Sequence, residues 1–402
     1  SRRSGHERCR RRPGHRPSYP DLFDDELGIT ESGNGIPDIV DEVKWETDWL
    51  ERMQLDDGSV LTKVGLLGFE SEPIPSEAYR PRFYEEACSS ATIAAAGMYA
   101  NAALVYDQFP ELSEDADRLR DRAVAAWDWY QSNPIEDDCD PQEVKAGDAD
   151  LSAEVQEQAE TLAAIYLFAL TGGSTYHNRV IAEHDTMLPF DGEGFGHYGP
   201  DEADALIYYT TLADADPDVV ESIEARIADL AEWSTLIGFD PGADLYRAFM
   251  PDYMYHWGSS RVKANSGAAN LLVDDIDGGR ERAQGHLQYF HGVNPLGLVY
   301  LSNMDDLGAE RSAQHLFHHW FGERTQFDVN RFPEGPGVPP GFVLGGPNRG
   351  YSGQTEPPAA QPVQKSYADW AAYGGEPAWE ITEPAIYYQS AYLRLLAGVL
   401  AN

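Results

Sequence analysis

Residues 31–53 read ESGNGIPDIVDEVKWETDWLERM, and this stretch sets the pattern of the whole chain. The Asn34-Gly35 pair is a turn signal, and Pro37 suits the first turn of the helix that follows. Apolar residues then recur at the spacing of one helix face, at Ile36, Ile39, Val40, Val43, Leu50 and Met53. The stretch therefore predicts a turn followed by an amphipathic helix.

The helical pattern recurs along the 402 residues, whereas strand signals are sparse. Further helices are predicted at 88–106, 113–131, 152–171, 201–213, 217–237, 263–273, 280–290, 308–321 and 384–400. Gly172-Gly173 is expected to stop the helix that ends at 171. Loops rich in Gly, Pro and aromatic residues separate them, mainly at 54–87, 187–200, 238–262 and 322–382. Alternating short turns and long loops predict an all-α toroid of helical hairpins with its site on the long-loop face.

The composition is strongly acidic. The chain has 68 Asp and Glu against 29 Lys and Arg, a net charge of −39, and only five of the basic residues are lysines. Such a surface repels nucleic acid and anionic lipid, so neither is expected as a partner. No apolar run approaches the length of a membrane span. Few lysines among many carboxylates are typical of proteins kept soluble in concentrated salt; an ordinary acidic secreted protein is the alternative.

The first nineteen residues differ from the rest. Residues 1–19 carry seven arginines and one glutamate, without apolar periodicity or the apolar region of a signal peptide. We interpret them as an anomalous segment, either an artefact or a divergent terminus, with a basic nucleic-acid arm as the alternative. The three cysteines, Cys9, Cys88 and Cys139, are too few and odd in number for a disulfide framework, and their spacing indicates no zinc site.

Four blocks in order carry a family resemblance. Residues 31–42 (ESGNGIPDIVDE) resemble the SGNG signature of glycoside hydrolase family 9, which includes many cellulases. The blocks YHWGSS at 255–260, HGVNPLG at 291–297 and TEPAIYY at 382–388 resemble the motifs that follow it in that family. The resemblance covers residues 20–402, which we expect to be one catalytic domain. It implies an (α/α)6 barrel, in agreement with the helical pattern.

The resemblance also implies inverting hydrolysis of β-1,4-glucan. In that chemistry an acid carboxyl protonates the leaving oxygen and a base carboxylate activates a water. Glu383 falls on the family's general acid; from the residues alone, a helix-capping acid is the alternative. Tyr388 falls on a tyrosine beside the sugar ring near the cleavage point, and His318 falls on a substrate-binding histidine. Trp257 is expected to stack on a sugar face.

Several other residues keep two interpretations. Trp320 stands where the family pattern has an arginine, which leaves that contact open, and His319 has no family counterpart. Asn348 closes a GGPN loop and could shape the cleft or form a turn. Three tyrosines in long loops could be further stacking platforms or core residues: Tyr84, Tyr198 and Tyr351.

The family's general base is absent from its expected place. It belongs to a DAGD motif before the SGNG block, where this chain has residues 1–19 and no aspartate. Ala146-Gly147-Asp148, followed by Asp150, is interpreted as a helix-entry loop instead. We therefore expect the first barrel helix to be missing or replaced. The alternative to an active enzyme is a catalytically impaired glycan-binding relative.

Two routes would restore a base. Another carboxylate could act, with Asp21, Asp24 and Asp25 the nearest upstream candidates, or an adjoining copy could supply the missing helix. Loss of that helix would expose an apolar seam, so the expected state is a monomer or a dimer that buries the seam.

This chemistry requires no cofactor, and no residue is assigned as a metal ligand. Structural calcium could bind the acid-rich loop GPDEAD at 199–204, which is otherwise a solvated face. The expected substrate is β-glucan or cellooligosaccharide, with glucosamine oligomers left open. We expect a secreted, salt-adapted endo-β-1,4-glucanase.

Overall fold

The computed structural model describes residues 23–68, 79–145, 147, 150–191, 195–229, 244–273, 278–318, 325–329, 331–371 and 375–401. Its main elements are helices: α1 (Asp38–Leu50), α2 (Ser89–Tyr106), α3 (Ser113–Ser132), α4 (Ala153–Thr171), α5 (Ser174–Glu183), α6 (Pro200–Tyr209), α7 (Pro217–Asp229), α9 (Ser259–Asn270), α10 (Gly279–Phe290), α11 (Trp379–Thr382) and α12 (Ile386–Leu400). Strands β1 (Val64–Gly65) and β2 (Phe83–Tyr84) pair antiparallel, and β3 (Val299–Ser302) and β4 (Ser312–Ala313) pair parallel. The predicted all-α class is confirmed.

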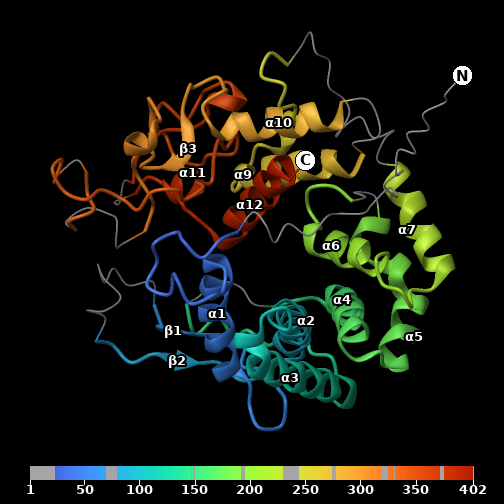
Figure 1. The fold of residues 1–402 in the computed structure, drawn as a ribbon. Coiled ribbons are helices and arrows are strands. Elements are labelled where there is room, and N and C mark those ends of the chain that lie inside the picture. Colours follow the sequence, from blue (N-terminus) through green and yellow to red (C-terminus); the bar gives the residue numbers. More distant parts are fainter. Residues whose placement is uncertain are drawn as a thin grey trace, which may run out of the picture.

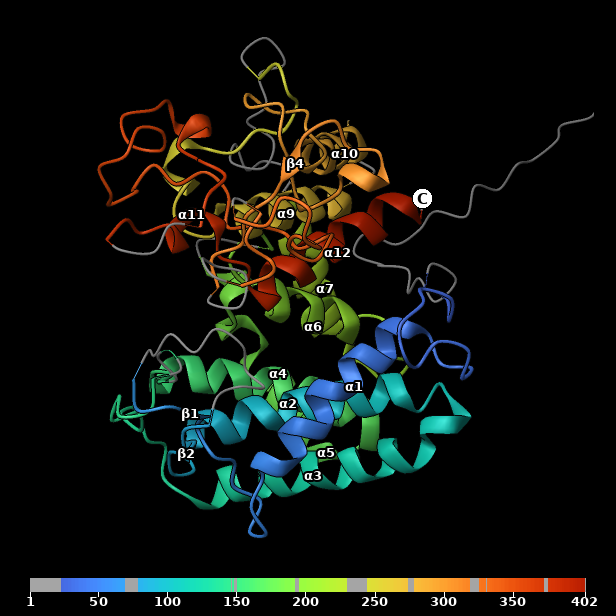
Figure 2. The same ribbon diagram turned by 90° about the vertical axis from the view of Figure 1, so that its left-hand side faces the viewer.

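The helices form two groups, one on either side of α6 and α7 (Figures 1 and 2). In the first group α2 packs on α3 and α4, and α4 packs on α5 and α6. In the second group α9 packs on α10 and α12. Each group has its own apolar core, and α9 joins them because Ala269 and the following Leu272 belong to the first core. The arrangement is that of a helical barrel.

The turn before α1 forms because its carboxylates bind backbone N–H groups. Asp25 accepts hydrogen bonds from the amides of Gly33 and Gly35, at 2.5 and 2.7 Å. Both glycines have positive φ, near +90°, which residues with a Cβ rarely adopt. The buried Asp38 opens α1 and accepts from the Ser32 hydroxyl at 2.9 Å. The predicted turn and helix are therefore both present.

The ends of α4 follow the expected capping rules. The Ser152 hydroxyl accepts from the amide of Val155 at the start of the helix. At the other end Gly172 has φ +68°, and its amide binds the Phe168 carbonyl at 2.8 Å. The predicted stop at Gly172-Gly173 is confirmed.

One observed helix was not predicted, and one predicted helix is wrong. Helix α5 follows directly after this stop and was not predicted. The predicted helix at 308–321 is wrong over its described part: residues 312–313 form β4, and an irregular segment follows. Tertiary hydrogen bonds replace helical ones there, because Asp369 accepts from the amides of Gln314 and His315.

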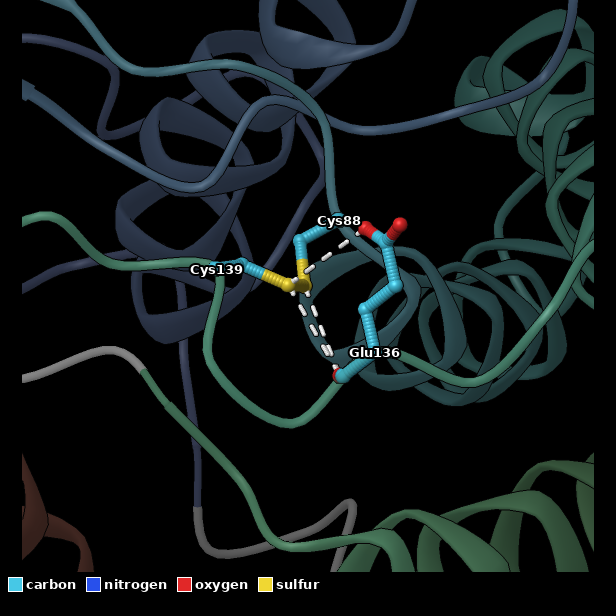
Figure 3. A group of neighbouring side chains, drawn as sticks. All are labelled: Cys88, Glu136 and Cys139. Carbon is cyan, nitrogen blue, oxygen red and sulfur yellow. Dashed lines mark hydrogen bonds between the residues drawn. A yellow bond between two sulfur atoms is a disulfide. The ribbon is translucent and has the colours of Figure 1, made fainter.

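A disulfide fixes the segment between α3 and α4. The odd cysteine count predicts no disulfide framework, yet Cys88 and Cys139 pair, with their Cα atoms 6.0 Å apart (Figure 3). Beside the pair, the buried Lys63 ammonium donates to Asp140 at 2.6 Å and to the Gly147 carbonyl at 2.7 Å. The disulfide and this ion pair together hold residues 139–145 and Gly147 against the segments that precede α2 and β1. Cys9 lies outside the described residues.

Large apolar side chains face solvent on several helices, and three of these helices carry more than one. On these three they include Val43, Trp45 and Trp49 on α1, Met98 and Val105 on α2, and Ile386, Leu393 and Leu400 on α12. Their exposure refers to a single chain and to the described residues. A dimer that buries an apolar seam stays a prediction. None of the described helices is both long enough and apolar enough to cross a membrane.

Candidate active site

The starts of α9 and α12 are joined by the loop that carries the GGPN sequence. The amide of Ser260 binds the Gly345 carbonyl at 3.0 Å, and the amide of Gly346 binds the Ile381 carbonyl at 3.0 Å. The Ser259 hydroxyl donates to the Pro347 carbonyl at 2.7 Å. These bonds run from the first turn of α9 to the residues just before Glu383. The loop therefore fixes the approach of the chain to that carboxyl.

Asn348 forms a turn rather than lining the cleft. It is buried, and its side-chain oxygen accepts from the amide of Gly350 at 2.8 Å. Its amide nitrogen is directed at Glu380, with 3.3 Å to the carboxylate. The turn interpretation is the one that fits this geometry.

Gly258 separates two predicted site residues, Trp257 and Tyr388. It has φ +79°, and a Cβ built on it would lie 2.7 Å from the Tyr388 hydroxyl. The Tyr388 ring is buried directly against this backbone. Only glycine satisfies both the conformation and the close approach. The WGSS block therefore brings the tryptophan to the start of α12.

A hollow of about 300 Å³ lies between these elements. Its lining includes Tyr198, His256, Trp257, Gly258, Arg261, Val262, Tyr387 and Tyr388. Trp257 is 50% exposed, so a large part of its side chain is accessible from the hollow or from solvent. Aromatic side chains that line a hollow suit the C–H faces of a pyranose. Tyr198 thus lies in the hollow, as one of its two interpretations predicts.

Polar contacts fix the rim of the hollow. The Tyr198 hydroxyl lies 3.2 Å from His256 Nε2, and His256 Nδ1 lies 2.8 Å from the Trp257 carbonyl. Because a carbonyl only accepts, Nδ1 carries the proton and the tyrosine donates to Nε2. Arg261 donates to the Tyr198 carbonyl at 3.3 Å and lies 5.2 Å from the Tyr387 ring centre. The segment before α6 is thereby tied to the first turn of α9.

Glu383 lies between α11 and α12 and is half-buried. Burial raises the pKa of its carboxyl, and a hydrogen bond from Trp257 opposes part of that increase. A raised pKa keeps more of the carboxyl protonated near neutral pH, which a proton donor requires. Two of the predicted site residues, Trp257 and Tyr388, therefore meet Glu383 in one place.

His318 lies in an exposed position on the segment after β4. The amide of Phe317, its neighbour, binds the Thr382 carbonyl at 3.1 Å, and Thr382 precedes Glu383. The Phe317 ring also packs edge-on against Trp379, with centres 5.6 Å apart. The backbone therefore places His318 beside the Glu383 segment. His319 and Trp320 lie outside the described residues.

The acids at the start of α6 belong to the loop that the sequence analysis assigned to calcium or to a solvated face. Asp204 accepts from Arg394 of α12 at 2.6 Å. Asp201, one turn earlier, accepts no hydrogen bond from the described residues, and its neighbours are Asp204, Arg394 and Arg261. Surrounding protein raises the pKa of Asp201 although its side chain reaches solvent.

The other upstream carboxylates are occupied. Asp25 binds two backbone amides, which lower its pKa, and Asp24 accepts from the amide of Glu26. Asp150 accepts from the amides of Cys139 and Asp140, which agrees with a loop-holding role. Asp21, Ala146 and Asp148 lie outside the described residues.

The remaining candidate tyrosines lie apart from the hollow's lining. Tyr84 is exposed on β2, and the Tyr351 hydroxyl donates to Glu376 at 2.8 Å. Within the described residues, one group of three could offer ligands to a metal: Cys88, Glu136 and Cys139, whose sulfurs form the disulfide. The acids of residues 199–204 do not form such a group.

Comparisons with known proteins agree on one family. The model described as glycosyl hydrolase family 9 matches residues 18–396. Endoglucanase C of Cellulomonas fimi is 25% identical over 382 residues, 92% of this chain and 33% of that protein. The cellodextrinase of Butyrivibrio fibrisolvens is 25% identical over 386 residues, 92% of this chain and 66% of that protein. The crystal structure of a metagenome-derived glycoside hydrolase family 9 endoglucanase gives a TM-score of 0.76 at 26% identity, covering 94% of this chain and 65% of that one. This chain thus spans one to two thirds of these relatives.

Proposed function

This chain belongs to glycosyl hydrolase family 9, and from that premise we propose that it hydrolyses β-1,4-glucosidic bonds of cellulose or soluble β-glucan with inversion, with Glu383 as the general acid. The observation that carries this proposal is the half-buried Glu383 carboxyl beside Trp257, at a hollow lined by aromatic side chains. Two relatives are named endoglucanase and cellodextrinase, which supports a glucan substrate.

Four residues bind the substrate or transfer a proton in the proposed reaction. The Trp257 indole stacks on a glucose ring, and the buried Tyr388 supports the ring next to the scissile bond. His318 donates to a sugar hydroxyl from the segment beside Glu383. Glu383 gives its proton to the leaving oxygen, while a second carboxylate takes a proton from the attacking water. The raised pKa of Glu383 keeps that proton available.

The setting of the protein is part of the proposal. A disulfide is typical of oxidising compartments, which supports secretion. The net charge of −39 with five lysines supports activity in concentrated salt. No cofactor enters the chemistry, and structural calcium stays a prediction.

The second candidate is a glycan-binding relative without catalysis. This candidate is favoured because the given sequence contains no DAGD motif before the SGNG block. In that case the aromatic hollow would bind cellooligosaccharide and leave it intact. Binding and turnover therefore have to be measured separately.

The test uses the purified chain and a Glu383→Gln variant in about 2 M salt. We expect the chain to release reducing sugar from carboxymethylcellulose, and the substitution to lower that rate by about 10²–10⁴. Calorimetry with cellotetraose should show binding by both proteins. Binding without turnover by either protein would establish the glycan-binding alternative. Equal turnover by both would remove Glu383 from the acid role.

A further inference from the structure

We propose that Lys263 is a positioning residue of this site: its side-chain nitrogen holds the loop that carries Trp257 and thereby keeps the indole N–H on Glu383. The inference rests on the proposed function and adds to it a residue that acts through others. Lys263 lies in α9, six residues after Trp257, and is buried. A lysine is rarely buried unless its nitrogen has partners, so its contacts indicate what it does.

The side-chain nitrogen of Lys263 joins both ends of one loop segment to α9. Nζ donates to the Ala248 carbonyl at 2.5 Å and to the Tyr255 hydroxyl at 2.8 Å. It also lies 5.0 Å from the ring centre of Tyr255 and 4.4 Å from that of Tyr289 on α10. Between the two bonded ends lie residues 249–254, with the short 3₁₀ turn η8 (Asp252–Met254). One nitrogen therefore fixes the start and the end of this segment.

Tyr255 transmits this anchorage to Trp257, two residues later. The Tyr255 ring is buried, and its carbonyl accepts from the amide of Arg349 at 2.8 Å, directly after the GGPN loop. Tyr255 is thus held between α9 and that loop. On the other side of Trp257, the amide of Ser259 binds the His256 carbonyl at 2.9 Å. The backbone that carries the indole is therefore fixed both before and after it.

The fixed backbone determines where the indole N–H of Trp257 lies. Burial raises the pKa of Glu383, and the hydrogen bond from Trp257 opposes part of that increase. If Lys263 loses its contacts, the Tyr255 ring and the indole can shift, and the hydrogen bond to Glu383 weakens. The pKa of Glu383 then rises further. Lys263 is therefore expected to act on the acid although it does not touch it.

The contacts of Lys263 do not depend on its charge. Burial lowers the pKa of the Lys263 ammonium to about 7, and the Asp244 carboxylate opposes part of that decrease. A neutral amine keeps two N–H groups, which are enough for the Ala248 carbonyl and the Tyr255 hydroxyl. Loss of the proton from Lys263 therefore does not by itself release the loop.

Lys63 provides a matched control. It is the other buried lysine among the five of this chain. Its Nζ donates to the Asp140 carboxylate and the Gly147 carbonyl, in the segment between α3 and α4. None of these three residues lines the hollow. Replacing Lys63 with Met therefore also removes a buried, hydrogen-bonded nitrogen, but it leaves the loop that carries Trp257 untouched.

The experiment compares Lys263→Met and Lys63→Met with the unaltered chain by calorimetry with cellotetraose and by kinetics across pH. We expect Lys263→Met to weaken binding and to lower kcat/KM, each by about tenfold. The basic limb of its kcat/KM profile should move upward, because Glu383 loses a hydrogen bond that lowers its pKa. In a Trp257→Phe background that bond is already absent, so Lys263→Met should not move the limb further. Lys63→Met should lower the urea midpoint, with affinity within about threefold and an unmoved limb.

The outcomes separate this inference from the proposed function. Unchanged affinity and an unmoved limb in Lys263→Met, or the same changes in Lys63→Met, would overturn the inference and leave the hydrolytic function standing. If the unaltered chain binds cellotetraose and cleaves nothing, the proposed function fails, and the two affinities decide on Lys263. Should Lys263→Met not fold, Tyr255→Phe replaces it, because it removes the hydroxyl and keeps the ring. The same direction of change is then expected, and unchanged affinity with an unmoved limb overturns the inference.

Discussion

The two walls of the hollow differ in how their carboxylates are held. On the α9–α12 side, backbone hydrogen bonds through Gly345 and Gly346 fix the residues before Glu383, and Trp257 hydrogen-bonds to its carboxylate. On the α6 side, the Asp204–Arg394 ion pair spans to α12. A proton donor needs a fixed position, and the α9–α12 wall provides one for Glu383. The α6 wall depends on an ion pair between side chains, which is easier to disturb.

The α9–α12 wall should be more sensitive than the α6 wall to the addition of one methyl group. We expect Gly258→Ala to lower kcat/KM by about 10²-fold, because the new Cβ would meet the Tyr388 hydroxyl at 2.7 Å and displace the site. The measurement is steady-state kinetics on cellotetraose. Gly297→Ala is the control: φ there is +58°, and a Cβ would meet nothing within 4 Å. Equal losses in both variants would attribute the effect to backbone strain alone.

The α6 wall should depend on its ion pair. Replacing Arg394 with Met leaves Asp204 without its partner across the barrel. We expect a loss of about 1–2 kcal/mol in the free energy of unfolding, less than for a fully buried pair because Asp204 is partly exposed. Urea unfolding at low salt measures it. Arg120→Met, which breaks an exposed pair with Asp117, should change stability by less than about 0.5 kcal/mol. If the two variants behave alike, the pair does not hold this wall.

The smallest expected effect concerns the proton of Glu383. Trp257→Phe keeps an aromatic face and removes the indole N–H, which lowers the pKa of Glu383. Without that hydrogen bond the pKa of Glu383 rises further, so the acid stays protonated to higher pH. We expect the basic limb of the kcat/KM profile to move upward by a fraction of a pH unit. A downward move, or none, would show that this bond does not act on the acid.

The sequence motifs named more residues of the α9–α12 wall than of the α6 wall. Motif blocks around Trp257 and Glu383 identified that wall, since its chemistry is written in contiguous residues. The Asp204–Arg394 pair carried no such mark: in a chain with 68 acidic residues, the carboxylate that pairs with Arg394 is visible only in three dimensions.

Long-range contacts also explain the errors in the fold. The helix expected at 308–321 gives way to β4 because β3 and Asp369 supply its hydrogen bonds from elsewhere. The Cys88–Cys139 pair joins residues 51 positions apart, and neither spacing nor count indicated it. Both features depend on chain segments that meet only after folding.

The two apolar cores have a consequence for how the chain acquires its structure. One core draws on residues 36–227 with a small contribution from α9, and the other on residues 248–395. Each half can therefore collapse on its own contacts, as multidomain chains do during synthesis. The Asp204–Arg394 pair joins residues 190 positions apart, so we expect it to close last. Pulse-labelling hydrogen exchange should then find protection in α2 and α4 before it appears in α12.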